Sequence, residues 1–338
     1  MHPAQMELNL TFTETAERTP AAGRPPGIRS AQGKAVLLMA YGSPRSRAEI
    51  LPYYTHMRRG RPPAPAALAE LERRYAAIGG RSPLQEITER QAEALERELR
   101  RRDGAEWQVV VGMKHSPPFL EDAVSQLQAD GVALAVGLVL APHFSHMSIG
   151  EYVSRARAAQ AKLPRRLDLR FVTDWHLDPG YLGWLCDRVQ EQLTQVDAPR
   201  GEALVIFTAH SLPARLKEMG DPYPGQLAET AAAVAQRAQL PNWTTAWQSV
   251  AQTGEPWLGP ELLDVVRNAA ARGTRQFVVC ACGFTADHLE ILYDLDVEAQ
   301  AEAARLKVQL TRTPMPNARS DFADVLATLV QAQITTTP

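Results

Sequence analysis

The residues best suited to chemistry lie in the stretch CACGFTADHLEILYDLDVE, which runs from residue 280 to residue 298. The apolar residues at 276–282 predict a buried strand, which then turns and continues as a helix. Asp287, His288 and Glu290 would therefore follow the carboxyl end of a strand. In open parallel sheets, this is the edge at which ligands bind.

Three carboxylates in this stretch recur every four residues, namely Glu290, Asp294 and Glu298. Because four residues turn an α-helix by about 40° beyond a full turn, the three would share one helical face. Like charges at this spacing repel by roughly a few tenths of a kcal/mol per pair, and the sequence has no Lys or Arg between residues 288 and 304. The pattern fits either a solvated acidic face or a site for a divalent cation.

A histidine in a second motif favours the chemical interpretation. His210 follows the apolar run 203–209 within the motif TAHSLP, so it is also expected at the end of a strand. A neutral imidazole beside a carboxylate can bind a borderline metal or accept protons near neutral pH. Taken alone, a histidine after a strand is more often structural, and the pairing of His210 with Glu290 is what indicates chemistry.

Several long motifs resemble those of ferrochelatases, the enzymes that insert ferrous iron into porphyrins, in both order and spacing. The first three are most similar to the coproporphyrin III ferrochelatases of Gram-positive-type bacteria, and the resemblance covers roughly residues 34–312. The motifs are AYGSP at 40–44, YYTHMRRGR at 53–61, IGGRSPL at 78–84, TAHSLP at 208–213, GDPYPGQL at 220–227, WQSVAQTGEPWLGP at 247–260 and GFTADHLEILYDLD at 283–296.

The resemblance implies that His210 and Glu290 are the catalytic residues and bind the metal, and it leaves open which of them takes protons. Asp287 and His288 are expected to support Glu290. Asp287 would cap the helix. His288 would be an orienting contact, because regular helix geometry turns it about 200° from Glu290.

Asp294 and Glu298 resemble an acidic line that holds a hydrated divalent ion in the family. Their oxygen ligands suit Mg²⁺ better than a permanent transition metal.

The porphyrin itself is expected to contact a further set of side chains. By resemblance, Tyr41 meets the metal from the face opposite the histidine, and phenolate oxygen can serve as an axial ligand to haem iron. Four propionates need more anchors than two, and arginines pair well with carboxylates. Arg58, Arg59 and Ser82 are the candidate anchors. The remaining candidates, at the macrocycle edge and along the cleft, are Tyr54, Lys114, His115, Ser249 and Trp257.

Length and composition narrow the class of protein. The chain has 338 residues, enough for two domains, and its net charge of −2 provides no positive field for nucleic acid. No apolar run approaches the length of a membrane span, and no basic segment followed by an apolar core opens the sequence, so we expect a cytoplasmic protein. The three cysteines are fewer than the four thiolates that an iron–sulfur cluster needs, so no cluster is expected.

Short apolar runs alternate with helical patterns from residue 35 onward, which is typical of a parallel α/β sheet. The runs fall into two sets of four, separated near residues 174–180. With the resemblance, this predicts a chelatase fold: two Rossmann-like domains, each with a four-stranded parallel sheet flanked by helices. The runs are 35–41, 107–113, 133–141, 167–173, 203–209, 244–250, 276–282 and 307–312.

The predicted organisation has four parts. Residues 1–33 form a mobile extension, 34–174 the first domain, 175–315 the second domain with the catalytic residues, and 316–338 a helix that returns to the first domain. We expect a monomer with no permanently bound cofactor, with ferrous iron and a propionate-bearing porphyrin as substrates, Mg²⁺ at the acidic helix, and a downstream haem-pathway enzyme as a possible partner.

Other functions were weighed against this one. A protoporphyrin IX ferrochelatase is the nearest alternative to a coproporphyrin III enzyme. A non-catalytic haem carrier could use the same cleft without needing the carboxylates from Glu290 to Glu298. A sirohaem or cobalamin chelatase shares the fold but is not expected to carry YYTHMRRGR. A nucleotide-binding Rossmann enzyme would show G-x-G-x-x-G where this chain has Tyr41-Gly42-Ser43-Pro44.

Overall fold

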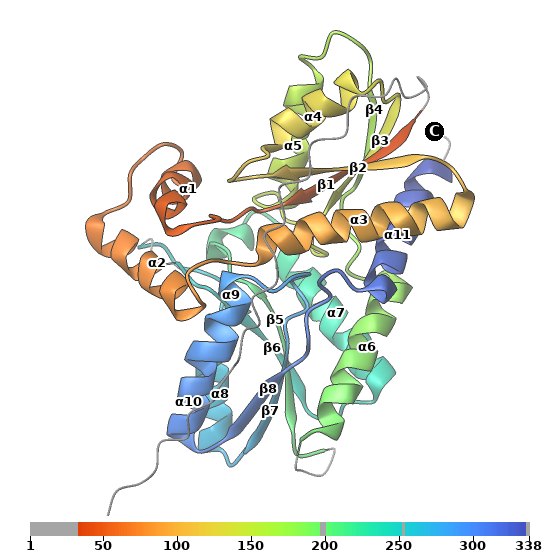
Figure 1. Ribbon diagram of the computed structural model, residues 1–338. Coiled ribbons are helices and arrows are strands. Elements are labelled where there is room, and N and C mark those ends of the chain that lie inside the picture. Colours follow the sequence, from red (N-terminus) through yellow and green to blue (C-terminus); the bar gives the residue numbers. More distant parts are fainter. Residues whose placement is uncertain (1–32, 197–200, 252–253, 336–338) are drawn as a thin grey trace, which may run out of the picture.

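Two four-stranded sheets, both entirely parallel, form the framework of the protein (Figure 1). The computed structural model describes residues 33–196, 201–251 and 254–335, so the predicted extension lies almost wholly outside the described residues. The strand orders are β2-β1-β3-β4 in the first sheet and β6-β5-β7-β8 in the second. Each strand overlaps one of the eight predicted apolar runs, and the predicted fold class is confirmed.

The first sheet is built around β1 (Lys34–Ala40), which pairs with a strand on each side. Its residues from Ala35 to Met39 are fully buried, because helices cover both faces of the sheet, as parallel sheets require. The helices α4 (Leu120–Ala129) and α5 (Ile149–Gln160) pack on one face, and α3 (Leu84–Asp103) packs on the other. The other strands are β2 (Trp107–Met113), β3 (Leu134–Val139) and β4 (Asp168–Val172).

Between β1 and α3 the chain makes an excursion away from the first sheet, visible on the left of Figure 1. It consists of η1 (Arg47–Glu49), α1 (Ile50–Met57) and α2 (Pro65–Ala77). Its α2 lies beside the second domain, where Arg73 donates a hydrogen bond of 2.6 Å to the Tyr293 hydroxyl. The excursion therefore brings residues of the first domain over the edge of the second sheet.

The second sheet has the same plan, with β5 and β7 at its centre. Its strands are β5 (Leu204–His210), β6 (Trp243–Gln248), β7 (Gln276–Cys280) and β8 (Gln309–Arg312). Its helical segments are α6 (Pro179–Thr194), η2 (Ala214–Leu216), α7 (Tyr223–Ala238), α8 (Leu262–Ala271), α9 (Leu289–Leu292), the π-helix η3 (Asp294–Ala299) and α10 (Gln300–Leu306).

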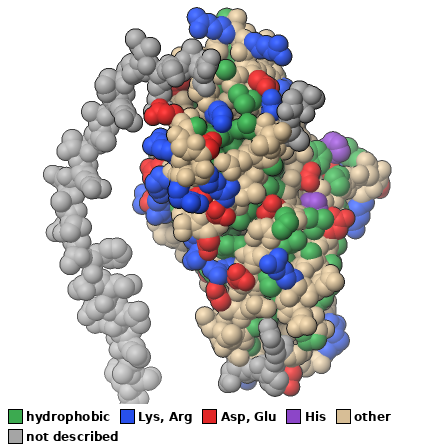
Figure 2. Space-filling view, turned by 90° about the vertical axis from the view of Figure 1, so that its right-hand side faces the viewer, with side chains coloured by type: hydrophobic (Ala, Val, Ile, Leu, Met, Phe, Trp, Pro, Cys, Tyr) green, Lys and Arg blue, Asp and Glu red, His purple; other side chains and the backbone are tan. Residues whose placement is uncertain are grey.

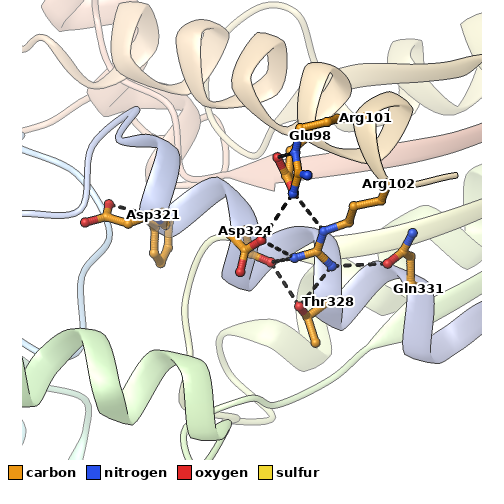
Figure 3. Close-up of polar contacts among 8 residues, drawn as sticks. Glu98, Arg101, Arg102, Asp321, Asp324, Thr328 and Gln331 are labelled. Atoms are coloured by element: carbon orange, nitrogen blue, oxygen red, sulfur yellow. Dashed lines mark hydrogen bonds and ion pairs between the residues drawn. The ribbon is translucent and has the colours of Figure 1, made fainter. Parts of the chain in front are cut away.

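The last helix, α11 (Ser320–Thr335), lies against α3 of the first domain. Figure 3 shows Arg102 of α3 at the centre of this contact. Its guanidinium pairs with Asp324 at 2.6 Å and donates hydrogen bonds of 3.0 and 3.1 Å to Thr328 and Gln331. Since α11 also packs on α6, it ties the second domain to the first.

Polar contacts at the domain junction fix the two sheets relative to one another. The Gln91 amide donates to the carbonyl oxygens of Thr285 and Asn317 at 3.0 and 3.1 Å. The Thr285 hydroxyl donates to the Leu140 carbonyl at 3.1 Å. The loops that follow the strands of both sheets are therefore held together.

The surface carries both signs of charge. Acidic and basic side chains lie side by side over most of the face in Figure 2, as the small net charge of −2 predicts. No helix within the described ranges is both long and apolar enough to cross a membrane.

Candidate active site

A cavity of about 650 Å³ opens between the two domains. Its walls are formed by residues that follow the strands of both sheets, including Tyr41 after β1, Leu140 after β3, His210 at the end of β5 and Gly283 after β7. The edge at which parallel sheets bind ligands is thus shared by two sheets. The cavity is large enough for a sizeable organic ligand.

His210 and Glu290 meet inside this cavity. The His210 Nε2 atom lies 3.4 Å from the Glu290 Oε1 atom, and both residues line the cavity. His210 is held by its position as the last residue of β5 and by the Tyr223 hydroxyl, which donates to its carbonyl at 2.9 Å. Glu290 belongs to the first turn of α9, and the Gln248 amide donates to its carbonyl at 3.4 Å.

The hydrogen bonding of His210 sets its protonation. Its Nδ1 atom bonds the Ser211 carbonyl, which can only accept, so Nδ1 carries the hydrogen and Nε2 faces Glu290. Burial alone would lower the pKa of His210, but the Glu290 carboxylate outweighs it and raises the pKa to about 9. Burial would raise the pKa of Glu290, and its interaction with His210 instead holds that pKa below its ordinary value. At neutral pH the pair is an imidazolium with a carboxylate.

His288 also reaches Glu290, which corrects the geometry expected from the sequence. The helix begins at Leu289, and His288 is its extended N-cap residue, with φ −158° and ψ −175°. The helical angle of about 200° therefore does not apply. The His288 Nε2 atom lies 3.8 Å from Glu290 Oε2, while its Nδ1 atom donates to the Ala286 carbonyl at 3.0 Å.

Asp287 does not cap the helix, and that prediction is wrong. Its carboxylate pairs with Arg312 at 3.0 Å and accepts a hydrogen bond of 2.6 Å from the Asn317 amide. The Asn317 side chain also accepts from the Asp287 backbone N–H at 2.8 Å. Asp287 thus anchors the turn before α9 to the chain around residues 312–317, and it supports Glu290 only through the backbone.

The carboxylates that follow Glu290 are not on one continuous α-helix. Asp294 begins the π-helix η3, and the Glu298 N–H donates to the Tyr293 carbonyl five residues back, at 2.9 Å. Asp294 is 8% exposed and accepts a hydrogen bond of 2.5 Å from Ser249. Burial and then the nearby Glu290 raise the pKa of Asp294 to about 7. Glu298 is exposed.

The positive charge that the local sequence lacks comes from another part of the chain. The Arg74 guanidinium on α2 lies 3.9 Å from the Asp294 carboxylate. Within the described residues, no three His, Cys, Asp or Glu side chains converge on a position that could hold a metal. An ion bound at Asp294 and Glu298 would therefore need water ligands, which Mg²⁺ retains readily.

Tyr41 faces the pair from the first domain. Its ring lies 4.6 Å from that of His115, centroid to centroid, and the Lys114 Nζ atom lies 5.8 Å from the Tyr41 ring. Burial raises the pKa of Tyr41, and the charges of Glu290 and Glu151 raise it further. The phenol is therefore neutral at physiological pH.

His115 is neutral for a related reason. Burial and the adjacent Lys114 lower the pKa of His115 to about 3. Its Nδ1 atom lies 3.0 Å from that of His56, so one of the two rings donates and the other accepts. Lys114 is itself buried, and its Nζ atom pairs with Glu151 at 2.7 Å.

The structure places most of the other predicted porphyrin contacts on the cavity wall. Tyr54, Arg59, Ser82 and Trp257 line it. Arg58 and Ser249 are not among the lining residues: the Arg58 guanidinium lies 5.9 Å from the Tyr54 ring centroid, and Ser249 bonds Asp294. Contact of either with a porphyrin stays a prediction.

Several lining residues were missed by the sequence analysis. They come from helices and loops that carry no strand-end signal, so only the tertiary fold brings them to the cavity. They are Tyr53, Tyr75, Met147, Glu151, Tyr152, Arg215, Tyr223 and Glu255.

The fold and the site together define a class of protein, the chelatases. SirB from Bacillus subtilis with Fe³⁺ superimposes with a TM-score of 0.53 over 90% of this chain and 96% of that chain, at 12% identity. This likeness shows the fold alone. The Ferrochelatase family model matches residues 33–334, and the chain belongs to that family.

Curated relatives agree with the family assignment. The coproporphyrin III ferrochelatase of Halalkalibacterium halodurans is 44% identical over 303 residues, which are 88% of this chain and 96% of the relative. That of Bacillus subtilis strain 168 is 43% identical over 298 residues, covering 87% and 96%.

Proposed function

We infer that this protein inserts Fe²⁺ into coproporphyrin III and so forms Fe-coproporphyrin III, or coprohaem, in haem biosynthesis. The observation that carries this conclusion is the His210–Glu290 pair, which faces Tyr41 across a cavity of about 650 Å³. The similarity to coproporphyrin III ferrochelatases over most of the chain supports the choice of substrate.

Metal insertion requires two pyrrole N–H protons to leave and Fe²⁺ to replace them, with no covalent intermediate on the protein. The resting pair holds a proton on the Nε2 atom of His210. An arriving Fe²⁺ disfavours that proton electrostatically, so the proton passes to solvent water and the Nε2 lone pair is freed. His210 and Glu290 then serve as metal ligands and proton acceptors on one face of the macrocycle.

Tyr41 acts on the opposite face. As a neutral phenol it leaves the unmetallated ring undisturbed, and the metal lowers its pKa enough for the oxygen to become an axial ligand. The propionates are anchored by Arg59, Ser82 and Tyr54 through charge-assisted and hydroxyl hydrogen bonds. Arg58 is a further candidate anchor.

The remaining assignments follow from this function. Fe²⁺ is a substrate, no cofactor or iron–sulfur cluster is permanently bound, and Asp294 and Glu298 hold a hydrated Mg²⁺. The protein acts in the cytoplasm. A single chain supplies both walls of the cavity, which supports a monomer. It hands its product to the next enzyme of haem synthesis.

A spectral assay under anaerobic conditions tests the proposal by comparing Fe²⁺ insertion into coproporphyrin III and protoporphyrin IX. We expect a higher initial rate with coproporphyrin III. Equal or reversed rates would assign the protein to the protoporphyrin enzymes, and binding of both porphyrins without insertion would indicate a haem carrier.

A further inference from the structure

Both walls of the cavity carry Lys or Arg side chains. Among the described residues, the Lys and Arg side chains on the lining are Arg59 and Lys114 from the first domain and Arg215 from the second. Lys114 is not available to a carboxylate of the ligand, because it is buried and paired with Glu151. A flat substrate with carboxylates around its whole edge must meet both walls, and the second domain offers it one guanidinium.

Arg215 is held in a fixed relation to the catalytic histidine. It belongs to η2, five residues after His210. The Ala214 N–H donates to the Pro256 carbonyl, and the Leu258 N–H donates to the Leu212 carbonyl, both at 2.8 Å. These bonds join the segment 211–216 to the segment that carries Trp257, whose ring lies 6.4 Å from that of His210.

The Arg215 guanidinium is already paired with a carboxylate of the same chain. Glu255 forms an ion pair with the Arg215 guanidinium and also lines the cavity. The two side chains are 49% and 37% exposed, so the pair is open to solvent and to ligand. Exposed ion pairs contribute little to stability, about 1 kcal/mol or less, and can exchange partners at low cost.

We propose that Arg215 binds one propionate of the porphyrin, and that Glu255 is a built-in competitor that occupies the guanidinium while the cavity is empty. The inference rests on the proposed function and assigns one anchor for its substrate. Glu255 presents the same chemical group as a propionate, so binding exchanges one carboxylate for another. Glu255 therefore limits affinity for the porphyrin and eases its release.

Binding of coproporphyrin III in the absence of metal, measured by fluorescence at low salt, distinguishes the roles of Arg215 and Glu255. Glu255→Gln frees the guanidinium and is expected to lower Kd roughly two- to fivefold, the range that exposed ion pairs supply. Arg215→Gln is expected to raise Kd by a similar factor. The double variant is expected to match Arg215→Gln alone, because Glu255 acts only through Arg215. High salt should shrink all of these differences.

A matched control is the pair Arg267–Glu302, which joins at 2.6 Å outside the cavity. Arg267→Gln should leave Kd unchanged. The proposal is overturned if Glu255→Gln weakens binding or leaves it unchanged, or if the effects of the two variants add. Iron insertion by the unaltered protein is measured alongside, so failure of this inference with normal turnover is distinct from failure of the proposed function.

Discussion

Two histidines on opposite walls of the cavity, His115 and His210, are held in opposite charge states. Burial lowers the pKa of both. At His210 the neighbouring Glu290 carboxylate outweighs burial and raises the pKa to about 9. At His115 the neighbouring Lys114 adds to burial and lowers the pKa to about 3. The sign of the neighbouring charge therefore decides which wall stores a proton.

In the proposed mechanism, this difference gives the two walls of the cavity different roles in metal insertion. On the second-domain wall, the proton shared by His210 and Glu290 can be displaced when Fe²⁺ arrives. The first-domain wall presents neutral rings, Tyr41 and His115, against which a flat macrocycle can lie. A porphyrin between them meets a reactive face and a supporting face.

The largest effect is expected from removal of the His210 imidazole, which holds the proton. His210→Ala should lower the rate of iron insertion by about a thousandfold, within the range of lost acid–base catalysis. Porphyrin binding should persist, since the walls and anchors remain. Stopped-flow spectra with Fe²⁺ and a separate fluorescence binding curve measure the two effects. A turnover like that of the unaltered protein would remove His210 from the mechanism.

Removing the charge of Glu290 is expected to change turnover through its effect on His210. Glu290→Gln should lower kcat by about a hundredfold and lower the pKa of His210 toward its ordinary value, because the largest influence that opposes burial is then lost. The pH profile of kcat should shift to lower pH together with it. An unshifted profile would mean that Glu290 acts only as a metal ligand.

On the supporting wall, Tyr41→Phe removes the hydroxyl and keeps the ring. Turnover should fall by less than about tenfold, the scale of one lost polar contact. After the bound product is oxidised by air, its ferric iron should lack the absorption of a phenolate ligand, and the product should bind less tightly. A bound product with unchanged spectrum would show that Tyr41 is not an axial ligand.

The smallest effect is expected in stability, at Asp294. Its pKa of about 7 lies above that of the unfolded chain, so folding binds a proton and stability falls as pH rises from about 4 to 7. Asp294→Asn removes this penalty. Its Tm should exceed that of the unaltered protein by more at pH 8 than at pH 5. A Tm gain that does not grow with pH would mean that Asp294 ionises freely in the folded state.

The features that could be predicted from the sequence are those that depend on strand ends and on local motifs. His210 and Glu290 could be placed together because carboxyl ends of neighbouring parallel strands share an edge. The π-helix from Asp294 to Ala299 could not be predicted, because the four-residue spacing of the carboxylates indicates a regular α-helix.

Contacts between distant segments could not be predicted. Arg74 compensates Asp294 from 220 residues away in the chain, and Glu151 pairs with Lys114 from 37 residues away. Asp287 had the right residue type for a helix cap, but Arg312 and Asn317 offer its carboxylate charged and amide donors that the helix start does not.

The account is tested most directly by an NMR titration of the histidine side chains in the metal-free protein. It predicts that His210 stays protonated through neutral pH and titrates at about 9, while His115 stays neutral down to about pH 3. Titration of both imidazoles together near pH 6.5, the value of an unperturbed histidine, would contradict it.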